Sequence, residues 1–358
     1  MGEKKKILVA MSGGVDSSTT AALLKNEGHE VIGVTMQLWD YANTTAGCCT
    51  LEDVSDARRV AERIGIPHYV VNYMGVFKKY IIEDFIKKYS AGLTPNPCIL
   101  CNQFVKFNFL LKRTMELGAD FLATGHYASI KKSESDGRYY LTKAADSSKD
   151  QSYFLFPLTQ RELSRLMFPL GMMSKEEVRA AACSFGLDVA DKPDSQDICF
   201  VSGGDYRDFI KTYSDVESGE GEIVDMDGNV LGYHGGVYSF TVGQRRGLGI
   251  SGNDNPLYVV KVEPKTNRVY VGGEEELYRT TLLAKDMVWA TEPLKGHREV
   301  KARIRHRHTE SEATVKTQPG NKAVVVFKKR QRAMTPGQAV VLYDGDMVLG
   351  GGWISEVQ

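Results

Sequence analysis

The first two hundred residues alternate between short apolar runs and longer segments in which apolar residues recur every three or four positions. Runs of strand length occupy residues 7–11, 31–36, 68–72 and 121–124. Segments with helical periodicity lie between them, among them residues 54–64 and 76–89. This alternation predicts an α/β domain with a parallel sheet, right-handed crossovers and a ligand site at the carboxyl ends of the strands.

The helix signals in this region include start and stop residues. Gly65 follows the segment 54–64, as expected of a glycine that ends a helix. Ser174 with Glu177 three residues later predicts a capping box, which opens a helix that runs to about residue 185 and stops at Gly186. These signals fix the direction and extent of the predicted helices.

The pattern changes after about residue 204. Glycine-rich turns separate short β-prone pieces, and residues 282–358 form short strands throughout, including 300–304, 323–327, 339–343 and 347–350. This spacing predicts a small closed β-barrel. We therefore predict a domain over residues 1–204, a central domain over 205–281 and a barrel over 282–358.

Length and composition are those of a globular protein. The 358 residues suffice for two or three buried cores, and 42% are hydrophobic and 25% charged. No apolar run is long enough to cross a bilayer, and the five apolar residues after Lys4-Lys5-Lys6 are too few for a signal peptide. We expect a cytoplasmic protein with no membrane partner.

The most informative motif is Ser12-Gly13-Gly14-Val15-Asp16-Ser17-Ser18, directly after the first apolar run. Two glycines let the backbone approach an anion, and the following helix start offers unpaired N–H groups and a positive dipole end. Asp16 is a candidate Mg²⁺ ligand. The motif lacks the Gly-Lys-Ser/Thr ending of one nucleotide loop and the Gly-x-Gly-x-x-Gly of another. A phosphate site is expected; a turn that needs glycine only for its shape is the alternative.

Charge is unevenly distributed although the formal net charge is zero. Between Lys295 and Arg332 there are 12 Lys and Arg against three acidic residues. A strand would place Lys301, Arg303, Arg305 and Arg307 on one face, which favours a nucleic-acid backbone as partner over a merely solvated surface.

Six cysteines without a signal peptide argue against a disulfide scaffold. Cys98 and Cys101 have Cys-x-x-Cys spacing after two prolines, which by itself allows a redox couple, half a metal site or chance. Cys199 lies in the polar loop 194–200, where a lowered thiol pKa would make it nucleophilic. Cys183 is expected to pack in its helix, and Cys48 and Cys49 to be structural.

These motifs together resemble a known family. The first loop is similar to that of the N-type ATP pyrophosphatases, and nearly the whole chain resembles the bacterial tRNA-specific 2-thiouridylases. The matching pieces follow in order along the chain: residues 12–18, 47–49, 94–102, 123–128, 149–153, 192–200, 243–249, 335–338 and 351–353.

The resemblance implies a fold and a reaction. The fold would be an adenine-nucleotide α-hydrolase-like parallel sheet with helices on both faces, then a tRNA-contacting central domain and a tRNA-binding barrel. ATP with Mg²⁺ would adenylate O2 of the wobble uridine in tRNAs for Lys, Glu and Gln before sulfur replaces it. The implied ATP contacts are Ala10, Met11, Ser12, Gly13, Gly14, Val15, Asp16, Ser17, Met36 and Gly125. The implied tRNA contacts are Asn96, Pro97, Cys98, His126, Lys149, Asp150, Gln151, Arg305, His306 and Gln338.

The resemblance also assigns the sulfur chemistry. Cys199 would carry a persulfide, and Cys101 would release its sulfur and end in a disulfide with Cys199. The donor would be a cysteine desulfurase or a sulfur-relay protein. Many family members have aspartate where this chain has Cys98. The three thiolates of Cys98, Cys101 and Cys199 suit a [4Fe–4S] cluster with one open iron that binds inorganic sulfide. Persulfide relay and cluster-dependent thiolation both remain open at this point.

Two other classes of protein share part of the pattern. Another adenylating enzyme, such as a lysidine synthetase or an amidotransferase-type ligase, would need the first loop but neither Cys101 nor Cys199. A non-enzymatic RNA-binding or thiol–disulfide module would bind tRNA without ATP turnover, so replacement of Asp16 would leave its function intact.

Overall fold

A computed structural model describes residues 3–39, 50–193, 198–201, 205–214, 219–250, 255–290, 292–294 and 296–358. The chain forms two compact units. Unit 1 contains Met1–Ile81, Cys98–Gly204 and Asp346–Val348, and unit 2 contains Ile82–Pro97, Asp205–Gly345 and Leu349–Gln358. The segment Ile82–Pro97 thus groups with the C-terminal part of the chain, although it lies in the middle of the region that the sequence assigns to one α/β domain.

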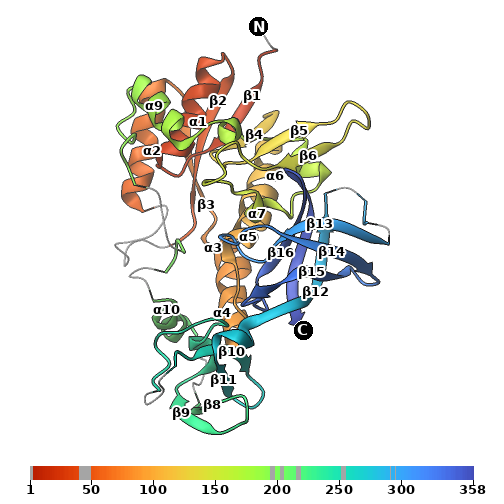
Figure 1. Ribbon diagram of the computed structural model, residues 1–358. Helices are drawn as coiled ribbons and strands as arrows, with labels where there is room; N and C mark the ends of the chain where they lie inside the picture. Colours follow the sequence, from red (N-terminus) through yellow and green to blue (C-terminus); the bar gives the residue numbers. More distant parts are fainter. Residues whose placement is uncertain are drawn as a thin grey trace. The chain divides into compact units, whose positions relative to one another are not determined.

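Unit 1 contains the predicted parallel sheet (Figure 1). Its strands are β1 (Lys6–Ala10), β2 (Glu30–Gln37), β3 (His68–Asn72), β4 (Phe121–Thr124) and β7 (Leu166–Met167). They follow the order β3-β2-β1-β4-β7, and every adjacent pair is parallel. The fold class predicted from the apolar runs is confirmed, and β1 is a central strand with the glycine loop at its carboxyl end.

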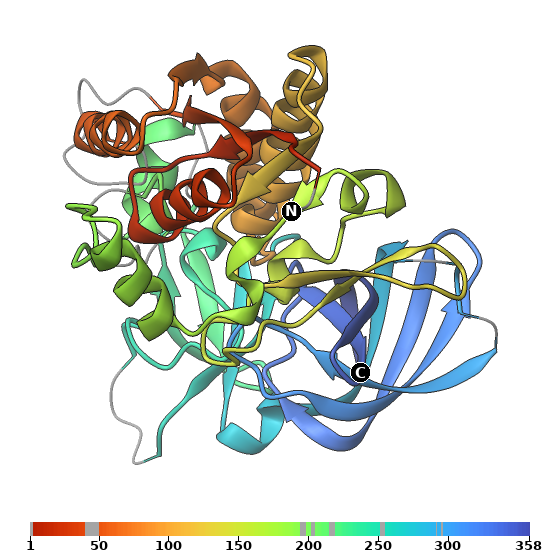
Figure 2. The same ribbon diagram turned by 90° about the horizontal axis from the view of Figure 1, so that it is seen from above.

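Three helices lie together beside this sheet. The helix α1 (Val15–Asn26) contacts both α2 (Leu51–Ile64) and α9 (Lys175–Ser184), as Figure 2 also shows. Small side chains let α1 pack closely, with eight of its twelve residues buried and Ala21 fully buried. Ser174 caps α9 with Glu177 as predicted, and Gly65 ends α2 in the left-handed conformation with φ +66.

The region around Cys98 and Cys101 is helical. The predicted helix 76–89 forms as α3 (Met74–Phe77), the π-helical η2 (Lys78–Ile82) and α4 (Glu83–Ser90). After a loop, α5 (Pro97–Leu100) leads into a second π-helical stretch, η3 (Cys101–Leu110), and then α6 (Leu111–Glu116). Proline suits the first position of a helix because it has no N–H to satisfy there. Cys98 and Cys101 therefore lie at the start of a helix.

Unit 1 is completed by short elements: β5 (Ser129–Lys132), β6 (Tyr139–Thr142), α7 (Ser152–Leu155), α8 (Gln160–Leu163) and η4 (Pro169–Met172). None of the helices in the described part of the chain is long and apolar enough to cross a membrane.

Unit 2 contains two β-structures. The first has the order β10-β11-β8-β9 and follows α10. The second has the order β12-β15-β14-β13-β16-β17 and closes through pairing of β12 with β17, so the predicted closed barrel is confirmed. Their elements are α10 (Tyr206–Tyr213), β8 (Gly221–Val224), β9 (Val230–His234), η5 (Val237–Ser239), β10 (Tyr258–Glu263), β11 (Arg268–Gly272), η6 (Glu274–Leu277), β12 (Tyr278–Trp289), β13 (His297–Arg303), β14 (Ser311–Gln318), β15 (Lys322–Arg332), β16 (Ala339–Asp344) and β17 (Met347–Val357).

Candidate functional site

The glycine loop connects β1 to α1, with Gly14 as the N-cap residue. Gly13 has φ +76, and a Cβ at that position would lie 2.2 Å from the backbone oxygen of Asp53 in α2. Only glycine permits this approach. A Cβ on Gly125, after β4, would lie 2.8 Å from the backbone nitrogen of Ser17. The structure therefore brings Gly125 to the first turn of α1, beside the other residues that the resemblance implies as ATP contacts.

The loop is braced by its own serines. The backbone N–H of Ser12 donates to Ser17 Oγ at 3.1 Å, and Ser17 Oγ donates to the Gly14 carbonyl at 3.2 Å. Met11, which follows Ala10, donates its N–H to Val34 of β2 at 2.8 Å. Val15 and Met36 are buried. That these residues contact a nucleotide stays a prediction.

Asp16 stands at the start of α1 with two donors on one oxygen. Its Oδ1 accepts from the Tyr127 hydroxyl at 2.8 Å and from Lys175 Nζ at 2.7 Å. Lys175 is only 12% exposed in its side chain and begins α9. The sequence places Lys175 at a helix start but gives no sign that its ammonium reaches Asp16, 159 positions away. A cation beside the loop adds to the attraction for an anion.

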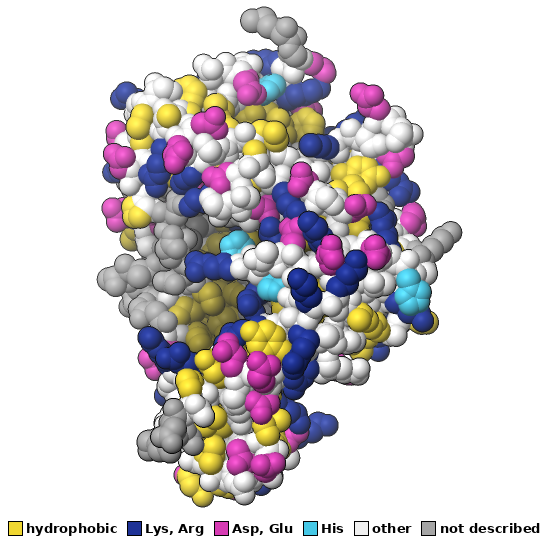
Figure 3. All heavy atoms as spheres, in the orientation of Figure 1, with side chains coloured by type: hydrophobic (Ala, Val, Ile, Leu, Met, Phe, Trp, Pro, Cys, Tyr) yellow, Lys and Arg dark blue, Asp and Glu magenta, His cyan; other side chains and the backbone are white. Residues whose placement is uncertain are grey.

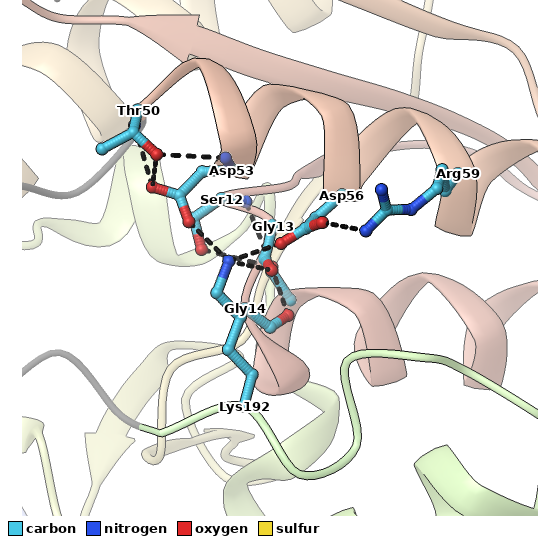
Figure 4. Close-up of polar contacts among 9 residues, drawn as sticks. Ser12, Gly13, Gly14, Thr50, Asp53, Asp56, Arg59 and Lys192 are labelled. Carbon is cyan, nitrogen blue, oxygen red and sulfur yellow. Dashed lines mark hydrogen bonds and ion pairs between the residues drawn. The ribbon is translucent and has the colours of Figure 1, made fainter. Parts of the chain in front are cut away.

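A second lysine that the sequence analysis did not single out, Lys192, contacts both the glycine loop and α2 (Figure 4). Lys192 Nζ donates to Asp53 Oδ1 and Asp56 Oδ2, each at 2.6 Å, and to the Gly13 carbonyl at 3.3 Å. Burial alone would lower the pKa of Lys192, but the two carboxylates outweigh it and the pKa is raised. Arg59 forms a further ion pair with Asp56.

His126 and the segment 149–151 hold positions inside unit 1. His126 is 9% exposed, and its Nδ1 lies 2.6 Å from Thr124 Oγ1. Burial, with a smaller contribution from Lys106, holds its pKa well below the usual 6.5. Asp150 is buried and accepts the N–H and hydroxyl of Ser152.

Gln151 forms two hydrogen bonds with Tyr127, one through its side chain and one through its backbone. The N–H of Tyr127 donates to Gln151 Oε1 at 3.0 Å, and the N–H of Gln151 donates to the Tyr127 carbonyl at 2.8 Å. Lys149, two residues earlier, is half-buried. The segment 149–151 therefore fixes Tyr127, which in turn contacts Asp16.

The cysteines differ in exposure. Cys98 is exposed, and Cys101 and Cys199 are half-buried. Phe200, next to Cys199, packs edge-on against Phe77 of α3, with 5.6 Å between ring centroids, and α3 contacts η3. Among the described residues, which include Cys98, Cys101 and Cys199, no three His, Cys, Asp or Glu side chains are arranged to hold a metal ion. Within the described part of the chain, Cys98, Cys101 and Cys199 do not form a ligand set for a [4Fe–4S] cluster.

The remaining cysteines are peripheral. Cys183 lies in α9 but is exposed, so the expectation that it packs in the helix is wrong. The side chain of its neighbour Ala182 is buried instead. Cys48 and Cys49 lie outside the described residues.

In unit 2, Gln338 holds the segment that leads to Cys98 and Cys101. Its Nε2 donates to the carbonyls of Thr94 at 3.0 Å and Pro95 at 3.3 Å. The N–H of Thr94 donates to the Pro336 carbonyl at 3.0 Å. Asn96 and Pro97 follow directly, so the barrel residues 336–338 anchor the start of this loop. The family resemblance implied Gln338 as a tRNA contact, and nothing in the sequence indicated its bonds to Thr94 and Pro95.

The basic stripe is only partly formed. Strand β13 ends at Arg303, so the expectation of one strand that carries all four cations is wrong, and Arg305 and Arg307 lie in the following turn. Arg303 is 14% exposed and pairs with Glu310 at 3.1 Å. Arg305 donates to the carbonyl of Arg332 at 3.1 Å, and His306 is half-buried.

Acidic residues distant in sequence meet several other cations of the barrel. Arg298 pairs with Asp344, and Arg330 and Arg332 pair with Glu275 and Glu274. On the face drawn in Figure 3, Lys and Arg side chains accordingly alternate with Asp and Glu. The local excess of positive charge is smaller than the sequence suggests.

Comparisons with known proteins match nearly the whole chain. A model described as the tRNA methyl transferase HUP domain matches residues 5–203, a tRNA methyl transferase PRC-barrel domain matches 207–273, and an Aminomethyltransferase beta-barrel domain matches 279–354. The parallel sheet with its glycine loop and the two β-modules therefore place the chain in the class of tRNA-modifying enzymes built on a HUP domain.

Curated relatives are more specific. The tRNA-specific 2-thiouridylase MnmA of Geobacter metallireducens is 54% identical over 98% of this chain and 97% of that protein. The MnmA proteins of Geotalea uraniireducens and Clostridioides difficile are 50% and 46% identical, each over 98% of this chain and over 95% and 98% of their own lengths. The chain belongs to the tRNA-specific 2-thiouridylase family, a family of sulfurtransferases.

Proposed function

We propose that this protein replaces O2 of the wobble uridine with sulfur in tRNAs for Lys, Glu and Gln, at the expense of ATP. Membership of the 2-thiouridylase family over the full length carries this proposal. The two family descriptions that mention methyl transfer each cover only one part of the chain, whereas the 2-thiouridylase relatives match nearly its full length.

The residues around the glycine loop suit the phosphates of ATP. Gly13 and Gly125 remove side chains where the backbone must come close, and the first N–H groups of α1 have no helical partners. Lys175 supplies a cation beside them. Adenylation turns the uridine oxygen into a good leaving group, and diphosphate is released. Asp16 is the candidate ligand for the Mg²⁺ that accompanies ATP, and Lys175 and Tyr127 hold its carboxylate in place.

Sulfur would arrive through Cys199. A donor persulfide passes its outer sulfur to the Cys199 thiolate, which becomes a persulfide while the donor keeps a thiol. The outer sulfur then attacks C2 of the adenylated uridine, and AMP leaves with the original oxygen. The thiolate of Cys101 then attacks Cys199 Sγ and breaks its bond to the outer sulfur, which stays on C2 of the uridine. The Cys101–Cys199 disulfide so formed must be reduced by an external dithiol. The donor would be a cysteine desulfurase or a sulfur-relay protein.

The cluster-dependent version has less support. Cys98, Cys101 and Cys199 do not form a metal-binding group in the described structure, and we derive no step through a cluster. Anaerobic purification followed by iron and sulfide determination separates the two versions. An iron-free enzyme that thiolates tRNA with a desulfurase supports the persulfide relay, whereas activity that requires iron and free sulfide contradicts it.

Mass spectrometry of anticodon nucleosides tests the function itself. The purified protein is incubated with tRNA, ATP, Mg²⁺ and a desulfurase with cysteine, and 2-thiouridine is measured. We expect 2-thiouridine at the wobble position, together with AMP. We expect neither 2-thiouridine nor AMP from the Cys199→Ala variant. AMP formation without any need for Cys101 or Cys199 would indicate another adenylating enzyme. Absence of 2-thiouridine from the wild type, aerobically and anaerobically, would contradict the proposal.

A further inference from the structure

The contacts of Lys192 have no role in the reaction just described. Its ammonium reaches a backbone carbonyl of the glycine loop and two carboxylates of α2 at once (Figure 4). Its own backbone is also fixed, because Arg179 of α9 donates to the Lys192 carbonyl at 3.1 Å. The side chain is therefore held at both ends.

The bond to the loop determines the orientation of one peptide group. The Gly13 carbonyl belongs to the planar trans peptide that also contains the N–H of Gly14, and the two groups point in opposite directions. With the carbonyl held by Lys192, the Gly14 N–H is directed away from Lys192. Glycine at both positions makes the reverse orientation accessible, and that orientation would present a carbonyl oxygen to a phosphate.

The carboxylates explain why Lys192 stays on this side of the loop. Asp53 and Asp56 are 15% and 6% exposed in their side chains, so their attraction for the ammonium is weakly screened. Thr50 holds Asp53 through the capping box of α2, and Arg59 holds Asp56. The cluster of Lys192, Arg59, Asp53 and Asp56 balances two positive against two negative charges.

We propose that Lys192 is a positioning residue that fixes the Gly13–Gly14 peptide in the orientation required to bind a nucleotide phosphate. This inference rests on the proposed binding of ATP at the loop. Lys192 acts through the backbone: its hydrogen bond to Gly13 matters more than its charge. If the Lys192 ammonium instead contacted the phosphate directly, its contribution to ATP affinity would depend chiefly on its charge.

Two substitutions separate these roles. Lys192→Met removes both donor and charge, whereas Lys192→Gln keeps an N–H donor without charge. We expect the dissociation constant of ATP to rise about tenfold in K192M, as for loss of a charge-assisted hydrogen bond, and to recover at least partly in K192Q. The dissociation constant of tRNA should change less than twofold. Equal weakening in K192M and K192Q would overturn the proposal.

A charge-balanced variant guards against simple loss of folding. Lys192→Met combined with Asp53→Asn leaves the Arg59–Asp56 pair intact and removes one charge of each sign. We expect it to melt close to the wild-type temperature and still to bind ATP weakly, because the Gly13 carbonyl lacks its donor. Recovery of wild-type ATP affinity in this double variant would contradict the positioning role.

The matched control is Arg59→Gln. Arg59 belongs to the same cluster but is 58% exposed and pairs with Asp56 rather than with the loop. We expect its ATP affinity to stay within twofold of the wild type. If the wild type binds ATP and K192M binds it equally well, only the role of Lys192 fails. If the wild type neither binds ATP nor forms 2-thiouridine, the proposed function fails instead.

Discussion

At Asp16, the first turn of α1 meets Lys175 of α9 and Tyr127 of the loop after β4. Asp16→Ala leaves the Lys175 ammonium and the Tyr127 hydroxyl without their shared acceptor and removes the candidate Mg²⁺ ligand. We expect formation of 2-thiouridine to fall at least about 100-fold, the scale of a lost electrostatic contact in an active site. The assay is nucleoside mass spectrometry at saturating tRNA.

Tyr127→Phe provides the graded comparison for this prediction. It removes one hydrogen bond and keeps the ring beside Lys175, so we expect a decrease of about three- to tenfold. Wild-type activity in D16A would show that the loop is a structural turn, as in the RNA-binding alternative.

Buried His126 makes stability depend on pH. Its imidazole is neutral in the folded protein, whereas in the unfolded chain it takes up a proton as the pH falls through 6.5. The unfolded state then binds more protons, so the free energy of unfolding decreases on acidification, by at most about 1.4 kcal/mol per pH unit. We expect His126→Gln to flatten this decrease between about pH 6.5 and 5.

Urea unfolding at a series of pH values measures this effect. Exposed His297, at the start of β13, provides the control variant His297→Gln, which should keep the wild-type slope. His68, His234 and His308 also have lowered pKa values, so part of the slope should remain in the H126Q variant. An unchanged slope in H126Q would contradict the assignment.

Individual elements were largely predictable because local chemistry determines them. Alternation of apolar runs and helical periodicity locates β3 and β4 to the residue, and the capping box locates the start of α9.

Ser174→Ala removes the cap of α9 and should lower the free energy of unfolding by about 1 kcal/mol. Ser184→Ala, at the other end of α9, should change it by less than about 0.5 kcal/mol. Equal urea midpoints for the two variants would refute this.

The loop from Thr94 to Pro97 is an element whose position the local sequence does not determine. Gln338 donates to two of its carbonyls, and a Cβ on Gly337, which has φ +93, would lie 2.8 Å from the Thr94 nitrogen. We expect Gln338→Leu and Gly337→Ala to slow thiolation more than tenfold because the loop that carries Asn96 is displaced. Single-turnover rates and filter-binding measurements with tRNA check this.

The size of the binding change identifies the role of Gln338. Its carboxamide is hydrogen-bonded to the loop. We therefore expect Gln338→Leu to change the dissociation constant of tRNA by a smaller factor than the thiolation rate. A parallel loss of rate and affinity would instead indicate that Gln338 acts mainly through direct contact with tRNA.

At the scale of the whole molecule, contacts between residues that only folding brings together could not be predicted from the sequence. Nothing local indicates that Lys175 reaches Asp16 or that Lys192 reaches Gly13, because these pairs are separated by 159 and 179 positions. The same limit affects charge. Counting along residues 295–332 misses Glu274, Glu275 and Asp344, which pair with three of the cations.

Neighbouring cations of β13 should therefore behave differently in tRNA binding. Lys301 is exposed, whereas Arg303 is 14% exposed and paired with Glu310. If Lys301 contacts a phosphate, Lys301→Ala reduces the slope of log affinity against log salt by about 0.7–0.9 and leaves stability unchanged. Arg303→Met leaves Glu310 without this partner and should lower the free energy of unfolding by about 1–3 kcal/mol with little change in salt slope. Filter binding between 50 and 200 mM salt and urea unfolding distinguish the two effects. The reverse pattern would mean that Arg303, despite its ion pair, is the residue that binds RNA.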